Sequence, residues 1–176
     1  MQITHTQEIQ ASVPKVFKIM RDDLATITSN LPNINSIEQI SRKTKGDGTV
    51  NIINHWQAKT KIPILLESII DPSMFAWADD ATWFEKKKYV AYDLKPLSGL
   101  ELFSAKGNNA FKPTKNGFTE LQMNCELKIN VGKIPGVPRF LASRISPAIE
   151  KLIHSVVEPN IIQLSLVFKD YIEDKG

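Results

Sequence analysis

The sequence predicts an α+β domain in which seven strands and two short helices precede one long C-terminal helix. Three observations predict this class. Alternation of apolar and polar residues, typical of half-buried strands, recurs in segments between Ile3 and Val131. Turn signals separate these segments. Beyond Pro138 the period becomes helical and stays so nearly to the end of the chain.

The composition indicates one domain that spans residues 1–176. With 42% hydrophobic and 23% charged residues, the chain is close to the average for soluble globular proteins. The 22 basic and 19 acidic side chains give a net charge of +3, and the basic ones are scattered, which argues against a nucleic-acid partner.

The compartment follows from what the sequence lacks. A single cysteine, Cys125, permits no internal disulfide. The N-terminal residues resemble no signal peptide, and no apolar stretch approaches the length of a transmembrane segment. We therefore expect a cytoplasmic protein, and transient contact with a membrane stays open.

One strand and two short helices are expected at the start of the chain. Residues 3–9 alternate with period two and predict the strand. Ser12 is a candidate N-cap, with Pro14 in the first turn, for a helix that runs to about Arg21. The second helix is expected to end before Pro32.

Two hairpins are predicted next. In residues 34–58, Gly46-Asp47-Gly48 supplies the positive-φ residues that a tight turn requires. The apolar insertion Ile62 to Ile70 begins with a proline and predicts one or two helical turns. Residues 75–94 form the second hairpin around Lys86-Lys87-Lys88, which we interpret as a solvated turn rather than an anion-binding patch.

The last two strands and the closing helix complete the chain. A strand from about Glu101 to Phe111 is followed by the turn Asn116-Gly117 and the most regular strand, residues 121–131. After a loop at 132–138, Ser146 and Pro147 form an N-cap and N1 pair that predicts the start of the main helix. Pro159 should kink this helix.

This order of elements resembles the helix-grip fold of the START-like superfamily, also called Bet v 1-like or SRPBCC. The superfamily includes lipid-transfer domains, polyketide cyclases and plant allergens. The local matches are the strand-to-helix entry Ala11-Ser12-Val13-Pro14-Lys15-Val16-Phe17, the Gly46-Asp47-Gly48 hairpin, and Glu150-Lys151-Leu152-Ile153 in the closing helix. The resemblance covers nearly the whole chain and rests on pattern, because the superfamily has no invariant catalytic motif.

The resemblance implies a seven-stranded, strongly curved antiparallel sheet that wraps around the long helix and encloses a cavity for a hydrophobic ligand. The inward positions of the strands carry large apolar side chains, which either line such a cavity or interdigitate as an ordinary core. The predicted ligand-binding residues are Trp56, Trp77, Trp83, Tyr92, Phe103, Met123, Cys125, Ile149, Ile153, Val156 and Val157.

Polar residues also fall on inward positions. His5 and Gln7 share the face of Ile3, and Asn54 shares that of Trp56. A buried polar group without a partner costs about 1 to 3 kcal/mol. We expect these groups to meet one another, water or the head group of a ligand.

Catalytic motifs are not evident. The sequence has no Gly-rich phosphate loop, no His-Glu-x-x-His pair and no paired-cysteine zinc spacing, so neither a cofactor nor a metal is predicted. Cys125 is expected to be a buried, inert thiol. The pair Asp22-Asp23 is interpreted as a helix end and Asp79-Asp80 as a solvated turn, rather than as general acids or bases.

Three functions are compatible with these observations. The leading hypothesis is a non-catalytic carrier of a lipid, isoprenoid or polyketide-like molecule, with Ile62 to Ile70 and Gly132 to Pro138 as movable gates. The alternative is a cyclase or hydratase, for which Tyr92, Glu101 and His5 are weak catalytic candidates. The third is an interaction module with a filled core. The sequence leaves the oligomeric state open.

Overall fold

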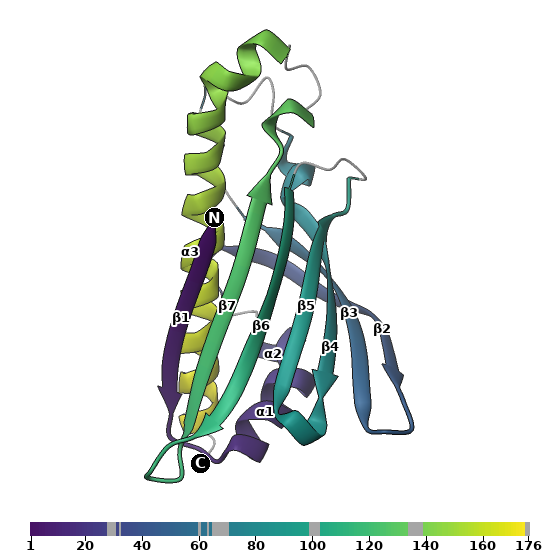
Figure 1. The fold of residues 1–176 in the computed structure, drawn as a ribbon, viewed down its shortest axis with the longest axis vertical. Helices are drawn as coiled ribbons and strands as arrows, with labels where there is room; N and C mark the ends of the chain where they lie inside the picture. Colours follow the sequence, from purple (N-terminus) through teal and green to yellow (C-terminus); the bar gives the residue numbers. More distant parts are fainter. Residues whose placement is uncertain are drawn as a thin grey trace.

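The computed structural model of the protein describes residues 1–27, 31, 33–59, 61–62, 64, 71–98, 103–133 and 139–174. Within these ranges the chain forms one antiparallel sheet of seven strands in the order β1-β7-β6-β5-β4-β3-β2 (Figure 1). The strands are β1 (Gln2–Ile9), β2 (Ile34–Thr44), β3 (Thr49–Ala58), β4 (Ala76–Phe84), β5 (Tyr89–Pro96), β6 (Phe103–Pro113) and β7 (Thr119–Ile129).

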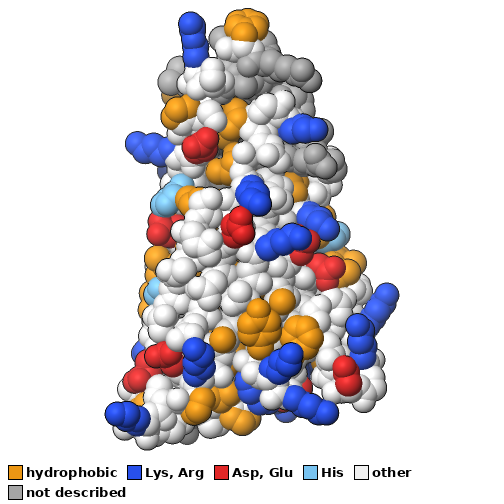
Figure 2. All heavy atoms as spheres, viewed as in Figure 1, with side chains coloured by type: hydrophobic (Ala, Val, Ile, Leu, Met, Phe, Trp, Pro, Cys, Tyr) orange, Lys and Arg blue, Asp and Glu red, His pale blue; other side chains and the backbone are white. Residues whose placement is uncertain are grey.

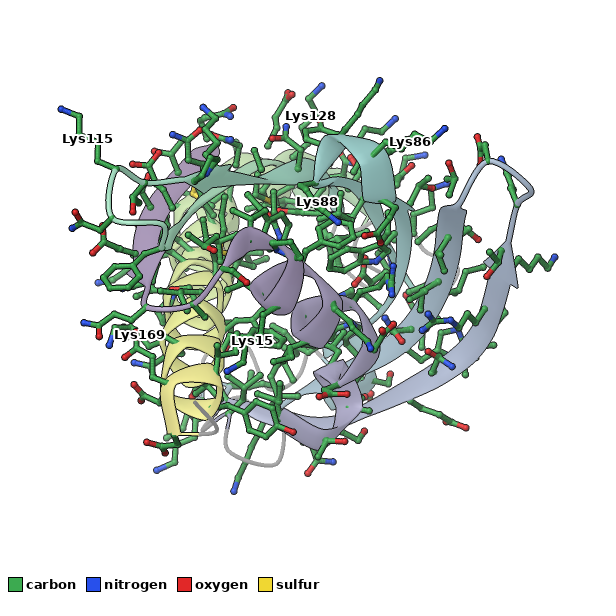
Figure 3. All side chains as sticks on the ribbon, turned by 90° about the horizontal axis from the view of Figure 1, so that it is seen from below. Lys15, Lys86, Lys88, Lys115, Lys128 and Lys169 are labelled. Atoms are coloured by element: carbon green, nitrogen blue, oxygen red, sulfur yellow. The ribbon has the colours of Figure 1, made fainter. Side chains whose placement is uncertain are left out.

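The helices lie on one side of this sheet. They are α1 (Val13–Asp22), α2 (Leu24–Ile27) and α3 (Arg139–Asp174), with short 3-10 turns η3 (Pro72–Phe75), η4 (Glu85–Lys87) and η5 (Val131–Lys133). Helix α3 runs along the sheet beside β1 and β7, while α1 and α2 lie at the lower end (Figure 1). Seen from below, the sheet curves around α3 and α1 (Figure 3). The predicted fold class, a curved sheet that wraps around a long C-terminal helix, is confirmed.

The outer face of the sheet carries many charged side chains, with a group of hydrophobic side chains towards its lower end (Figure 2). Basic and acidic side chains are spread over it without a dense patch of one sign (Figure 2). Among the described residues, no helix is both long enough and apolar enough to cross a bilayer.

The lower end of the molecule is closed by a packed core around α1. The Phe17 ring is fully buried and makes edge-to-face contacts with Trp83 and Phe111, with ring centroids 5.3 and 5.1 Å apart. Phe168 and Ile172 from α3 belong to the same cluster and are also fully buried. We call this cluster, together with the neighbouring ion pairs of Arg21, Asp22, Arg42 and Glu85, the closed end.

The lysine run at the β4–β5 turn is only partly solvated. Lys86 and Lys87 are exposed, as predicted. Lys88 instead has a left-handed backbone, with φ of 47°, and its ammonium lies 4.9 Å from the centre of the Phe17 ring. Lys88 also pairs with Glu85, so this lysine helps to cover the closed end (Figure 3).

The start of the closing helix differs from the sequence prediction. Helix α3 begins at Arg139 and continues through Pro147, so Ser146 is not its N-cap. Pro147 removes the hydrogen bond to the carbonyl of Ser143, but both residues are exposed, so this carbonyl is not left in the apolar core.

Smaller predictions had mixed outcomes. In the first hairpin only Gly48 has a positive φ, of 83°, because a single left-handed residue suffices for this turn. Helix α2 ends at Ile27 within the described residues. Most of the insertion Ile62 to Ile70 and residues 134–138 of the second expected gate lie outside the described residues.

Candidate functional site

A cavity of about 190 Å³ lies between the inner face of the sheet and the helices. Strands β2 to β7 and all three α-helices contribute to its wall. The strands place their side chains there because residues two apart share a face, and the antiparallel pairing aligns these faces from strand to strand. Trp56 of β3 is paired with Trp77 of β4, for example, and their rings stack with centroids 5.7 Å apart.

Most of the predicted ligand-binding residues border this cavity. The side chains of Ile153 and Val156 lie outside the described residues. The other nine line its wall: Trp56, Trp77, Trp83, Tyr92, Phe103, Met123, Cys125, Ile149 and Val157. Their role in binding stays a prediction.

Among the described residues of the cavity wall, Asp79 is the only acidic one. It lies in the middle of β4, directly opposite the buried Asn54 of β3, and not in a solvated turn as expected. The side chain borders the cavity, but its Oδ1 atom has no contact with solvent and no hydrogen-bond partner among the described residues.

Burial changes the acidity of Asp79. Removal of the carboxylate from water raises its pKa to about 7, and the charge of Asp80 adds to the rise. The indole N–H of Trp56 offsets part of this effect, although Trp56 Nε1 lacks a partner with hydrogen-bond geometry in the described structure. Asp79 is therefore divided between its neutral and charged forms near neutral pH.

Tyr92 lies flat against the inner face of the sheet. The end of its ring passes over Gly107, at the place where a Cβ atom would be, and its hydroxyl donates a hydrogen bond of 3.1 Å to the carbonyl of Asn124. Burial raises the pKa of Tyr92 above its usual range, with a smaller contribution from Cys125. Burial likewise raises the pKa of the Cys125 thiol, which keeps it protonated.

Two asparagines bring further unpaired atoms to the wall. Asn109 of β6 is buried, and its Oδ1 makes no hydrogen bond within the described part of the chain. Asn160 of α3 also lines the cavity, and neither end of its amide is paired with a described residue. Unpaired buried polar atoms are rare in native proteins and require an explanation.

The three weak catalytic candidates have different positions. Tyr92 lines the cavity. His5 faces inward from β1 but is not part of the cavity wall, and its buried Nε2 has no partner in the described structure. Glu101 lies outside the described residues. In the part of the chain that the structure describes, no three His, Cys, Asp or Glu side chains gather as metal ligands would.

Sequence reasoning missed Asp79, Asn109 and Asn160 as wall residues. For Asp79 a signal was present, because Trp77, Asp79, Ala81 and Trp83 follow one another with period two. The Asp79-Asp80 pair resembled a turn only when it was considered apart from its flanking tryptophans.

The comparisons with known proteins concern structure rather than sequence. The sequence matches no protein-family model and no curated protein. The fold is similar to that of the protein TTHA0849 from Thermus thermophilus, with a TM-score of 0.64 and 15% identity over 96% of this chain and 97% of that one.

Two further solved structures are similar over nearly their whole length. The Zhui aromatase/cyclase from Streptomyces sp. R1128 has a TM-score of 0.69 and 14% identity over 98% of this chain and 93% of that one. Ara h 8.0201 has a TM-score of 0.53 and 11% identity over 99% and 98% of the two chains. Identities this low establish the fold alone. The chain has the helix-grip fold.

Proposed function

We propose that this protein binds an apolar small molecule, such as a lipid, an isoprenoid or a polyketide-like compound, in the cavity between sheet and helices, and stores or carries it. The observation that carries the proposal is the cavity wall. It contains all three tryptophans of the chain, together with aliphatic and aromatic side chains from both the sheet and α3. Apolar walls with a few polar groups are typical of ligand sites.

The size of the cavity supports an occupant. An apolar cavity of about 150 Å³ in another protein holds benzene, so 190 Å³ accommodates a small aromatic or branched molecule. An empty void of this volume lowers the free energy of unfolding by about 5 kcal/mol at the cost per volume observed in protein cores. A ligand restores the lost contacts, which favours a carrier over an interaction module with a filled core.

A cyclase is the second candidate. The observation in its favour is Asp79, because a carboxyl group with a pKa of about 7 can both donate and accept a proton near neutral pH. Tyr92 is less suited to proton transfer, since its hydroxyl is engaged by the carbonyl of Asn124 and its pKa is raised.

Mass spectrometry tests the proposal directly. The protein is purified from its own cells and compared under native and denaturing conditions, and any bound compound is extracted into organic solvent. We expect an excess native mass that becomes an apolar compound on extraction. Incubation of the extracted compound with the protein then separates the two candidates. If the protein is a carrier, the compound stays unchanged, and if the protein is a cyclase, the compound is converted.

Two alanines on β6 provide a matched pair for probe uptake. Ala105 lines the cavity, whereas Ala110 is paired with Tyr89 on the outer face. Ala105→Phe should occupy a large part of the cavity and abolish the fluorescence enhancement of N-phenyl-1-naphthylamine, and Ala110→Phe should retain it. A clean apo mass together with no probe uptake by the unmodified protein would support the filled-core module instead.

A further inference from the structure

We propose that the cavity selects uncharged apolar molecules that carry a hydroxyl group, that Asp79 and Trp56 bind this hydroxyl, and that carboxylates of the same shape are excluded. The inference rests on the proposed function, because it takes the cavity as the ligand site. Beyond the proposed function, the inference states which polar group the ligand carries.

The unpaired atoms of the wall indicate that the ligand has a polar group. Asp79 Oδ1 and Trp56 Nε1 are inaccessible to solvent and have no hydrogen-bond partner among the described residues. Each such group costs about 1 to 3 kcal/mol when it stays unpaired. A hydrocarbon without polar atoms would leave both costs in place.

A hydroxyl group matches both atoms at once. Trp56 and Asn54 share a face of β3, and Asn54 is paired with Asp79 of β4, so the Trp56 and Asp79 side chains border the same part of the cavity. The Trp56 side chain also lies close enough to the Asp79 carboxyl to offset part of the rise in its pKa. The indole N–H only donates a hydrogen bond, and an ionised carboxylate only accepts one. A hydroxyl donates to Asp79 through its proton and accepts from Trp56 through its oxygen.

The charges around Asp79 disfavour an anion. Within the described wall there is no Lys, Arg or His. The titratable groups that face Asp79 are Tyr92 of β5 and, beyond Tyr92, Cys125 of β7, while Asp80 follows it on β4. The described wall residues of α1, α2 and α3 are uncharged. A ligand carboxylate would therefore lose its hydration without a cation in return and would meet a second acid.

Three probes with one skeleton test this inference: naphthalene, 2-naphthol and 2-naphthoate. Their dissociation constants are measured by calorimetry at about pH 5.5 and about pH 8, on either side of the Asp79 pKa of about 7. At the higher pH we expect 2-naphthol to bind at least about tenfold more tightly than 2-naphthoate, because a charge-assisted hydrogen bond forms with one and repulsion acts on the other. Protonation of Asp79 at the lower pH should narrow this ratio.

Variants separate the carboxyl group from its surroundings. Asp79→Asn has nearly the same shape and should narrow the ratio of the two dissociation constants to a few-fold and remove its dependence on pH. Asp80→Asn is the control, since this side chain hydrogen-bonds to Asn51 and does not line the cavity. It should retain the preference for 2-naphthol and its dependence on pH, with the midpoint at a somewhat lower pH because the charge of Asp80 no longer raises the pKa of Asp79.

Two outcomes overturn the inference, and they are distinguishable. If naphthalene and 2-naphthol bind equally and Asp79→Asn changes neither dissociation constant, or if 2-naphthoate binds as tightly as 2-naphthol at about pH 8, the cavity binds apolar molecules without the proposed selection for a hydroxyl and against a carboxylate. The proposed function then stands alone. If none of the three probes binds, the proposed function is wrong together with the inference.

Discussion

The closed end and the cavity wall are built on the same strands, β4, β5, β6 and β7, but they differ in their polar side chains. Those at the closed end are paired with one another, whereas several in the cavity wall have no partner among the described residues. At the closed end, Arg21 pairs with Asp22 at 2.8 Å and with Glu85 at 2.6 Å, and Arg42 also contacts Asp22 at 2.8 Å. In the cavity wall, Asp79 Oδ1 and the amide of Asn160 have no hydrogen-bond partner in the described part of the chain.

The pKa values of the carboxyl groups differ between the two regions in the same sense. Hydrogen bonds from Arg21 and then Arg42 lower the pKa of Asp22, and Lys88 and Arg21 lower that of Glu85. Burial raises the pKa of Asp79. The closed end therefore gains stability from its charges, whereas the cavity wall loses some to its own. Departures from locally favourable chemistry are concentrated at functional sites, so the comparison supports a ligand at the wall.

The largest expected effect is on the stability of the closed end. Phe17→Ala removes a fully buried ring from its contacts with Trp83 and Phe111, which should lower the free energy of unfolding by about 3 to 5 kcal/mol. Trp77→Ala, at the half-buried stacked ring of the wall, should cost less stability and weaken probe binding more. Urea denaturation and probe titration measure both, and equal losses of stability would contradict the division into two regions.

The next effect has the opposite sign. The pKa of Asp79 is raised, so between about pH 4 and pH 7 the folded protein binds more protons than the unfolded one, and stability falls as the pH rises. Asp79→Asn removes this penalty and should stabilise the protein at neutral pH by up to about 4 kcal/mol.

The pH profile of this variant is the sharper test. Below about pH 4, Asp79 is neutral in both the folded and the unfolded state, so the gain should disappear there. Melting temperatures across this range measure it. A variant that is less stable than the unmodified protein at neutral pH would indicate that the charge of Asp79 is compensated.

Substitution of Gly107 should cause a smaller loss of stability. A Cβ atom at this position would overlap the carbonyl oxygen of Asn124 and the end of the Tyr92 ring. Gly107→Ala should therefore displace Tyr92 from the inner face and destabilise the protein by about 1 to 3 kcal/mol. Gly46→Ala is a matched control, because its Cβ would meet nothing within 4 Å. Equal stability of the two variants would mean that both the Tyr92 ring and the Asn124 backbone move aside without cost.

Much of the fold and of the apolar wall was predictable from local patterns. Period-two alternation identifies the inner face of each strand, and turn residues such as Gly48 and Gly117, both with positive φ, separate the strands. For this reason the alternation alone predicts that Trp56, Trp77, Trp83 and Tyr92 face inward, and all four line the cavity in the structure.

The polar part of the wall was not predictable in the same way. The unpaired state of Asp79 depends on which atoms of β3, β5 and the helices approach it, and those contacts come from residues far apart in the sequence. Asn160 depends in addition on the rotation of α3 about its axis. The predicted start of α3 at Ser146 and Pro147 was wrong, because an exposed proline can lie inside a helix and does not have to begin one.

The smallest effect concerns the ion pairs of the closed end. The pKa of Asp22 is lowered in the folded protein, so its contribution is present above the unfolded-state value of 3.8 and is lost as the pH falls through the folded-state value. Asp22→Asn should cost about 1 kcal/mol at neutral pH, since the side chain is partly exposed and its pairs are screened. The cost should shrink in strong salt and disappear in acid. The effect of Asp79→Asn also disappears in acid, but at neutral pH it has the opposite sign, because that variant is expected to gain stability. Asp23→Asn, at the neighbouring carboxyl, controls for the general effect of a lost negative charge. If the two Asp→Asn variants at positions 22 and 79 shift stability in the same direction between acid and neutral pH, the contrast between the closed end and the cavity wall is wrong.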